Sequence, residues 1–149
     1  MYRVIEWVGL FLAGILAGEE FVVRYGVRGP LAALDDQAHI RLRQGLIGTL
    51  RVLVPATALP ALVVGVVVAL VDRGAFAFAG VGLLLGWLLV TVFGTVPINA
   101  GAMGWDPTAP PPNWRSLVDR WERLNTVRTW LAVLAFASFL TAAAIRLPH

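Results

Sequence analysis

The chain has 149 residues, 58% of them hydrophobic, and a mean hydropathy of +0.77, which excludes an ordinary water-soluble domain and predicts an integral membrane protein. Its net charge of +3 comes from arginines without any lysine, and these lie at the ends of apolar segments rather than on one soluble face, so no nucleic-acid partner is expected. The absence of cysteine excludes disulfides and thiol chemistry.

The first half of the chain contains two predicted membrane spans. Residues 4–24 form an apolar run that is long enough to cross the hydrocarbon core, although it carries acidic residues near both ends. A polar helical segment, residues 31–44, leads into the second span, residues 45–71. Pro55 and Pro60 lie inside this span, and a kinked helix is expected because proline removes a backbone donor.

The second half contributes two more spans, separated by a loop. The third span, residues 75–97, is expected to end at Pro97, because proline disfavours helical geometry in the residue before it. Residues 99–113 are rich in proline and glycine and are expected to form a loop. The fourth span covers residues 124–145, and the terminal His149 is expected to belong to a tail.

These elements predict one all-α domain over residues 1–149. It is an integral membrane four-helix bundle with a kinked second helix and a Pro/Gly-rich loop before the fourth. Most arginines flank the loops after spans one and three, and the positive-inside rule places these loops in the cytoplasm. The expected location is the bacterial cytoplasmic membrane, with both termini on the opposite side.

Most polar side chains within or beside the spans fall at one end of the predicted bundle, because successive helices alternate in direction. The candidates at this end are Glu19, Glu20, His39, Arg51, Thr95, Asn99, Trp121, Asn125 and Arg128. Trp121, Asn125 and Arg128 also share one helix face, at i, i+4 and i+7. Polar groups are costly in hydrocarbon unless they are paired or hydrated, so this gathering predicts a polar pocket. The alternative is an interfacial position in which they reach the headgroups or pair with arginine.

A metal site is not predicted. His39 with Glu19 and Glu20 would give a ligand set rich in oxygen, but the spacing matches no recognised ligand pattern. His39 is therefore either a hydrogen-bonded structural histidine or a catalytic base.

Two segments carry a resemblance to a known family. Residues 96–99 (VPIN) close the third span, and residues 121–129 (WERLNTVRT) open the fourth. Both resemble the anthrone-oxygenase-like family of integral membrane proteins. The resemblance implies a bundle of four transmembrane helices, oxygenation of anthrones to anthraquinones, and no conventional organic cofactor.

The resemblance also marks site residues. It implies that Asn99, Trp121, Arg128 and, less directly, His39 are pocket residues. Family members often have histidine where this chain has Asn125, and asparagine can orient a substrate but cannot take up its proton.

Oxygenase chemistry in such a pocket would begin with loss of a proton from an acidic C–H bond. Glu20 or His39 would be the base, and Arg128 would hold the developing enolate, while Asn99 and Asn125 would hydrogen-bond its oxygens. Glu19, Arg51, Thr95 and Trp121 are the expected substrate-binding residues.

A second class of function is open from the sequence. The same pocket would serve a protein that binds a lipid, a quinone or another apolar metabolite without turnover, or the chain would be an accessory subunit of a membrane complex. A transporter is disfavoured, because the spans are few and no inverted repeat is visible. The expected partners are an apolar or aromatic small molecule and the lipid bilayer, and formation of a homo-oligomer stays open.

Overall fold

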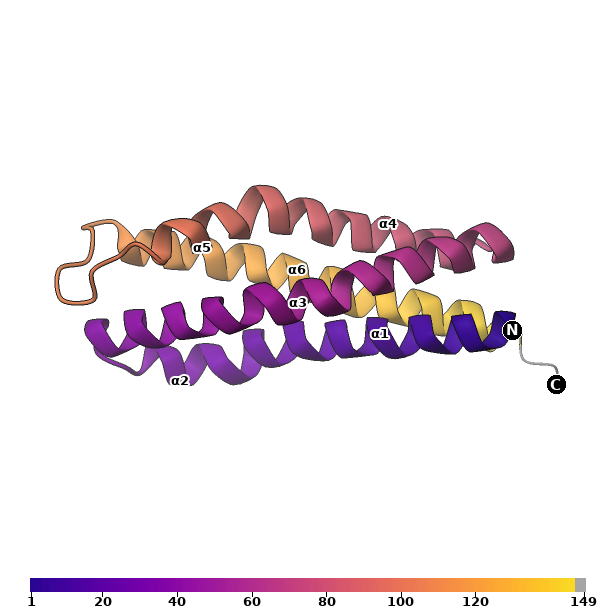
Figure 1. The fold of residues 1–149 in the computed structure, drawn as a ribbon, viewed down its shortest axis with the longest axis horizontal. Helices are drawn as coiled ribbons and strands as arrows, with labels where there is room; N and C mark the ends of the chain where they lie inside the picture. Colours follow the sequence, from indigo (N-terminus) through magenta and orange to yellow (C-terminus); the bar gives the residue numbers. More distant parts are fainter. Residues whose placement is uncertain (147–149) are drawn as a thin grey trace.

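The computed structural model describes residues 1–146, so the predicted tail at His149 lies outside the described residues. This part of the chain is almost entirely helical and has no strand. In chain order the elements are α1 (Tyr2–Val22), the π-helical η1 (Val23–Val27), α2 (Arg28–Ala32), α3 (Asp36–Asp72), α4 (Ala75–Val90), the π-helical η2 (Thr91–Thr95), α5 (Val96–Ala102) and α6 (Trp114–Ile145). Figure 1 shows them running along one long axis.

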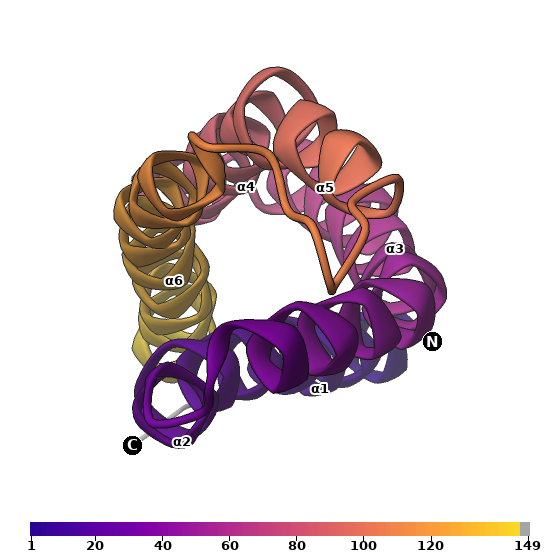
Figure 2. The ribbon, with the colours of Figure 1, turned by 90° about the vertical axis from the view of Figure 1, so that its left-hand side faces the viewer.

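The helices form the predicted four-helix bundle. α4 packs most extensively on α6, α1 packs on both α3 and α6, and α3 packs on α4, so each long helix has two neighbours around a common axis. Figure 2 shows this ring from one end, with α2 and α5 extending two of its walls. The predicted fold class is therefore confirmed.

Small residues let the helices approach closely. The ring of Phe139 on α6 lies against Gly80 on α4 and Gly65 on α3, and a Cβ atom built on either glycine would come within 2.8 Å of that ring. On α1, a Cβ atom at Gly9 would lie 2.9 Å from Val64. Close packing of this kind replaces the hydrophobic drive that is missing between helices in lipid.

Two helical segments differ from the sequence-based prediction. The third span does not end at Pro97. The helix has one wider, π-helical turn at η2, and α5 then continues it to Ala102. Pro97 lies in the first turn of α5, directly after the π-helical η2. The helix predicted from residue 31 is also interrupted, because Asp35 caps the start of α3 by accepting a hydrogen bond from the Ala38 N–H at 2.9 Å.

α3 is the predicted second span and carries both prolines inside one continuous helix. Figure 1 shows it changing direction along its length, as expected of a helix that contains proline. Its residues are almost entirely apolar beyond Arg51.

Three helices of the described chain are long and apolar enough to cross a membrane: α3, α6 and the continuous stretch Ala75–Ala102. This finding supports an integral membrane protein. α1 is the fourth helix of the bundle, but Glu6, Glu19 and Glu20 interrupt its apolar character, and its crossing of the bilayer stays a prediction.

Charged side chains mark the edges of the apolar part of the bundle. At the end that holds the chain termini, Arg146 pairs with Asp72 and lies 3.9 Å from Glu6. On α3 the next charged residue is Arg51, and the uncharged residues 52–71 between them span about 30 Å at about 1.5 Å per residue. This length matches the hydrocarbon core of a bilayer, about 30 Å thick. Arg51 therefore lies at the membrane boundary, and the bundle continues beyond it.

The loop between α5 and α6 covers this far end of the bundle, as Figure 2 shows. The Gln44 amide donates to the carbonyl oxygens of Ala102 and Trp105, each at 2.9 Å, which fastens the loop to α3. Beneath the loop, Ile40 and Trp114 pack with Val118 in a small apolar cluster, and Trp105 packs against it. In the loop itself, two hydrogen bonds from Thr108 lower the pKa of the exposed Asp106 carboxyl.

Candidate functional site

A cavity of about 390 Å³ lies inside the bundle and extends from the side of the apolar cluster below the loop to Pro55, one turn inside the apolar zone of α3. This volume falls in the range of small-molecule sites. Its walls come from α1, α3, α6 and the stretch from Trp87 to Met103, with η1 and α2 contributing on one side. Eight of the nine predicted site residues line it: Glu19, Glu20, Arg51, Thr95, Asn99, Trp121, Asn125 and Arg128.

A buried ion pair joins two adjacent walls of the cavity. Glu20 on α1 and Arg128 on α6 are paired, and their side chains are only 3% and 8% exposed. The Trp87 indole N–H donates to the same carboxylate oxygen at 3.1 Å, and the guanidinium lies 5.0 Å from the centre of that indole ring. Arg128 also donates to the Thr95 hydroxyl at 3.0 Å. Both charges are therefore compensated although they are buried, as burial requires.

A second group of charges lies nearer the covered end. The Glu122 carboxylate is 3.3 Å from the Arg43 guanidinium and 3.5 Å from that of Arg28. Arg43 lies over the ring of Trp121, with 4.9 Å between the guanidinium carbon and the ring centre. Arg43 and Glu122 are buried and line the cavity on the side of the loop, whereas Arg28 is exposed at its edge.

Several polar atoms of the lining have no hydrogen-bond partner among residues 1–146. They are Asn99 Oδ1, Trp121 Nε1, Glu122 Oε2, Asn125 Nδ2 and Arg128 Nε. A buried polar group without a partner costs about 1–3 kcal/mol, so a bound molecule or water that satisfies these atoms is favoured. Three of the five are donors, which suits a molecule with carbonyl or hydroxyl oxygens.

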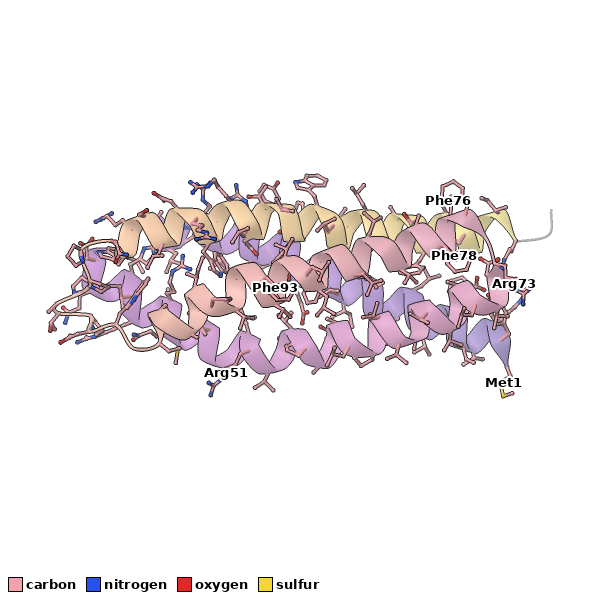
Figure 3. All side chains as sticks on the ribbon, turned by 90° about the horizontal axis from the view of Figure 1, so that it is seen from above. Met1, Arg51, Arg73, Phe76, Phe78 and Phe93 are labelled. Carbon is pink, nitrogen blue, oxygen red and sulfur yellow. The ribbon has the colours of Figure 1, made fainter. Side chains whose placement is uncertain are left out.

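Glu19 and Arg51 lie at the edge of the cavity. The Glu19 carboxylate accepts a hydrogen bond from the Thr57 hydroxyl at 2.8 Å and is half-buried. Arg51 is exposed, and Figure 3 shows its side chain directed away from the bundle at the outer edge of α3.

His39 is the predicted site residue that does not line the cavity. It is buried one turn beyond Arg43, on the side of the loop, and its Nε2 is 3.5 Å from the Arg43 Nε. Its ring meets that of Trp114 edge-on, with 5.3 Å between the centres. His39 therefore contacts a residue of the cavity lining, Arg43, but does not reach the cavity itself.

Two important lining residues were not predicted. Trp87 lies one helical turn before Thr91 and two before Thr95, so extending the polar stripe of the third span by one turn would have found it. Glu122 lies three residues before Asn125 and inside the segment that carries the family resemblance. Within the described residues, no three His, Asp or Glu side chains gather as a metal-binding group.

Comparison with known proteins gives one match. A family model described as anthrone oxygenase matches residues 46–138, which is more than half of the chain and runs from α3 to α6. No curated protein and no solved structure matches this chain. The matched range includes Arg51, Asn99, Asn125 and Arg128, whereas Glu20 lies before it.

Proposed function

Because the chain belongs to the anthrone oxygenase family, we propose that it oxygenates an anthrone-like substrate, a fused-ring aromatic ketone with an acidic CH₂ group, inside the cavity. The observation that carries this proposal is the buried pair of Glu20 and Arg128 on the wall of a cavity of suitable volume. Such a pair provides a proton acceptor next to a cation that holds an enolate.

The first step is transfer of a proton from the substrate CH₂ group to Glu20. The carboxylate becomes neutral as the substrate becomes an enolate, and the Arg128 guanidinium changes its partner from one anion to the other. The net charge of the buried site is the same before and after the transfer, so the step avoids the cost of an uncompensated charge in a medium of low polarity. The unpartnered donors of Trp121 and Asn125 are available to the enolate oxygen.

The second step is reaction of the enolate with O₂. The carbanion carbon gives two electrons to O₂ and forms a C–O bond, and a proton completes a hydroperoxide. This intermediate loses its remaining C–H hydrogen as a proton and breaks its O–O bond, which gives a new carbonyl group and one water molecule. The CH₂ group and O₂ thus become C=O and H₂O, and the protein residues return to their starting charges.

We also propose an orientation for the protein in the membrane. The end of the bundle that carries α2, α5 and their loops faces the cytoplasm, which the excess of arginine at this end supports. A cysteine introduced at the exposed Ala109 in the loop tests this, because an impermeant maleimide should label it in inverted vesicles and not in intact cells.

The test of activity uses the purified protein in nanodiscs, supplied with anthrone and ¹⁸O₂. The expected product is anthraquinone with one ¹⁸O atom, formed faster than in empty nanodiscs, which measure the uncatalysed oxidation. Glu20→Gln should lower the rate by about 100-fold or more, the contribution of a general base. Glu6→Gln is the matched control: this glutamate of α1 lies near Arg146 at the opposite end of the bundle and does not line the cavity, so its rate should stay close to that of the parent.

Two results would overturn the proposal. One is a folded parent protein that gives no acceleration over empty nanodiscs with any anthrone-like ketone tested. The other is a folded Glu20→Gln variant that retains the parent rate.

The second candidate is a protein that binds an apolar metabolite without turnover. Asn125 favours it, because its unpartnered amide can hydrogen-bond a ligand but cannot take up a proton. In the same assay a binding protein would retain the ketone unchanged and incorporate no ¹⁸O.

A further inference from the structure

The cavity has a mouth on the side of the bundle. Residues that line a cavity and are also exposed on the outer surface mark its opening, and these are Arg28, Arg51, Pro55, Val96, Ala100 and Met103. All but Arg28 lie on α3, on α5 or directly after α5. The short α5 makes few contacts with α3, as it does with α6. The opening is therefore the seam between these two helices.

The covered end of the bundle offers no comparable path. The loop is fastened to α3 through Gln44, and the cluster of Ile40, Trp114 and Val118 lies beneath it. No member of that cluster lines the cavity.

The depth of the mouth places it at the membrane boundary. Arg51 lies about 30 Å along α3 from the charged layer at the opposite end, at about 1.5 Å per residue. Pro55, one turn deeper, lies inside the apolar zone. The outer surface near the mouth is also apolar, since Phe93 is 74% exposed and Val52 67% exposed; Figure 3 shows Phe93 on the outside of the bundle. A molecule dissolved in the bilayer thus meets the mouth without crossing water.

Arg51 differs from the other arginines of the cavity. Arg128 is paired with Glu20, and Arg28 and Arg43 share Glu122, whereas Arg51 has no ion-pair partner within residues 1–146. An exposed guanidinium at the headgroup level is available to an anion that arrives along the membrane surface.

We propose that the cavity opens sideways to the bilayer between α3 and α5, and that Arg51 at this mouth selects amphiphilic anions. The ligand class is an apolar aromatic body that enters the cavity and an acidic group, such as a phenolate, carboxylate or sulfonate, that stays at Arg51. The inference rests on the proposed function only in taking the cavity as the substrate site, and its tests measure binding rather than turnover.

The first experiment compares two dyes with the same apolar body. 8-Anilinonaphthalene-1-sulfonate is anionic, and N-phenyl-1-naphthylamine lacks the sulfonate. Binding to the protein in nanodiscs of zwitterionic lipid is read from energy transfer, because Trp87 and Trp121 line the cavity. Arg51→Gln should weaken binding of the anionic dye by about five-fold, the effect of an exposed ion pair, and leave the neutral dye unchanged.

Controls separate the charge at the mouth from charge in general. Arg41→Gln removes another exposed arginine of α3 that does not line the cavity, and it should leave both dyes unchanged; Arg51→Lys should restore most of the lost affinity. The role of Arg51 is overturned if Arg51→Gln weakens both dyes equally or neither, with the variant folded by circular dichroism.

The second experiment tests the position of the mouth. The chain has no cysteine, so Ala100→Cys at the mouth and Ala109→Cys in the loop each provide a single site for a bulky maleimide. The label at residue 100 should abolish dye binding, whereas unlabelled Ala100→Cys and labelled Ala109→Cys should bind like the parent. Blocking by the label at residue 109 alone would place the opening at the end of the bundle and overturn the lateral mouth.

Failure of this inference and failure of the proposed function are distinguishable. Dye binding that follows these expectations without any oxygenation would refute only the oxygenase. Oxygenation without an effect of Arg51 or of the label at residue 100 would refute only the lateral mouth.

Discussion

The pair of Glu20 and Arg128 gives a sharp prediction about stability. Glu20→Gln removes the negative charge while keeping the size of the side chain, and it leaves the guanidinium of Arg128 buried without a counter-ion. Arg128→Gln leaves the opposite charge uncompensated. The two substitutions together leave no charge at all.

The burial of the pair determines how much folding free energy each single variant loses. The two side chains are 3% and 8% exposed, so water reaches neither charge freely. Breaking a buried pair by removing one partner costs about 3–5 kcal/mol of folding free energy, whereas replacing both partners costs much less. We therefore expect each single variant to lose about 3 kcal/mol or more, and the double variant to be more stable than either single variant.

The assay is a double-mutant cycle. Unfolding in mixed micelles with increasing dodecyl sulfate is followed by circular dichroism, and the coupling energy is the departure of the double variant from the sum of the single variants. The control cycle uses Asp36→Asn and Arg115→Gln, because this pair is 50% and 70% exposed and an exposed pair contributes about 0–1 kcal/mol. A coupling energy for Glu20 and Arg128 no larger than that of the control would refute the reasoning.

Three further predictions test packing, the position of His39 and the cofactor expectation. Gly80→Ala should destabilise the bundle by about 1–3 kcal/mol, because the new Cβ meets the Phe139 ring, whereas Gly82→Ala, with open space around it, should not; dodecyl sulfate titration measures both. His39→Gln should leave the affinity for the neutral dye unchanged, since His39 lies outside the cavity, and a loss of affinity comparable to that of Arg128→Gln would contradict this placement. Elemental analysis of the purified, folded protein should find less than one equivalent of any transition metal, because Glu19, Glu20 and His39 match no recognised ligand spacing, and a stoichiometric metal would contradict this.

The architecture could be predicted from the sequence, because the length of an apolar run predicts a membrane-spanning helix and a segment rich in proline and glycine predicts a loop. Residues 45–71 and 124–145 lie inside α3 and α6, and the loop before the fourth helix follows from its prolines and glycines. The prediction that the third span ends at Pro97 is wrong. Proline disfavours helical geometry in the residue before it, but here the helix continues through that residue. A π-helical turn, η2, directly precedes α5 and Pro97, and no pattern in the sequence of residues 91–95 predicts this turn.

The sequence predicts which helix faces line the site, but it does not predict how far along each helix the cavity extends. His39, Arg43 and Ile47 share one face of α3 at i, i+4 and i+8, so the sequence treats them alike. The cavity nevertheless reaches Arg43 and stops before His39. At this end Trp105 of the loop and Trp114 at the start of α6 pack beside His39 and Ile40, and such long-range packing is not encoded in the periodicity of α3.

The position of the cavity fits the proposed oxygenation by O₂ better than a site deeper in the membrane would. An apolar ketone and O₂ both partition into the bilayer, and the mouth beside Pro55 opens to it, whereas the water molecule that the proposed reaction forms must leave toward the aqueous side. The arginine- and glutamate-rich end of the cavity, with Arg28, Arg43 and Glu122, continues from the buried pair toward that side. A charged site in the middle of the hydrocarbon core would lie about 15 Å from water and would carry the full cost of burying its charges. A site wholly in water would instead have to extract the ketone from the bilayer. The bundle extends its helices past the hydrocarbon core and places the reacting pair just inside the boundary, so neither cost arises.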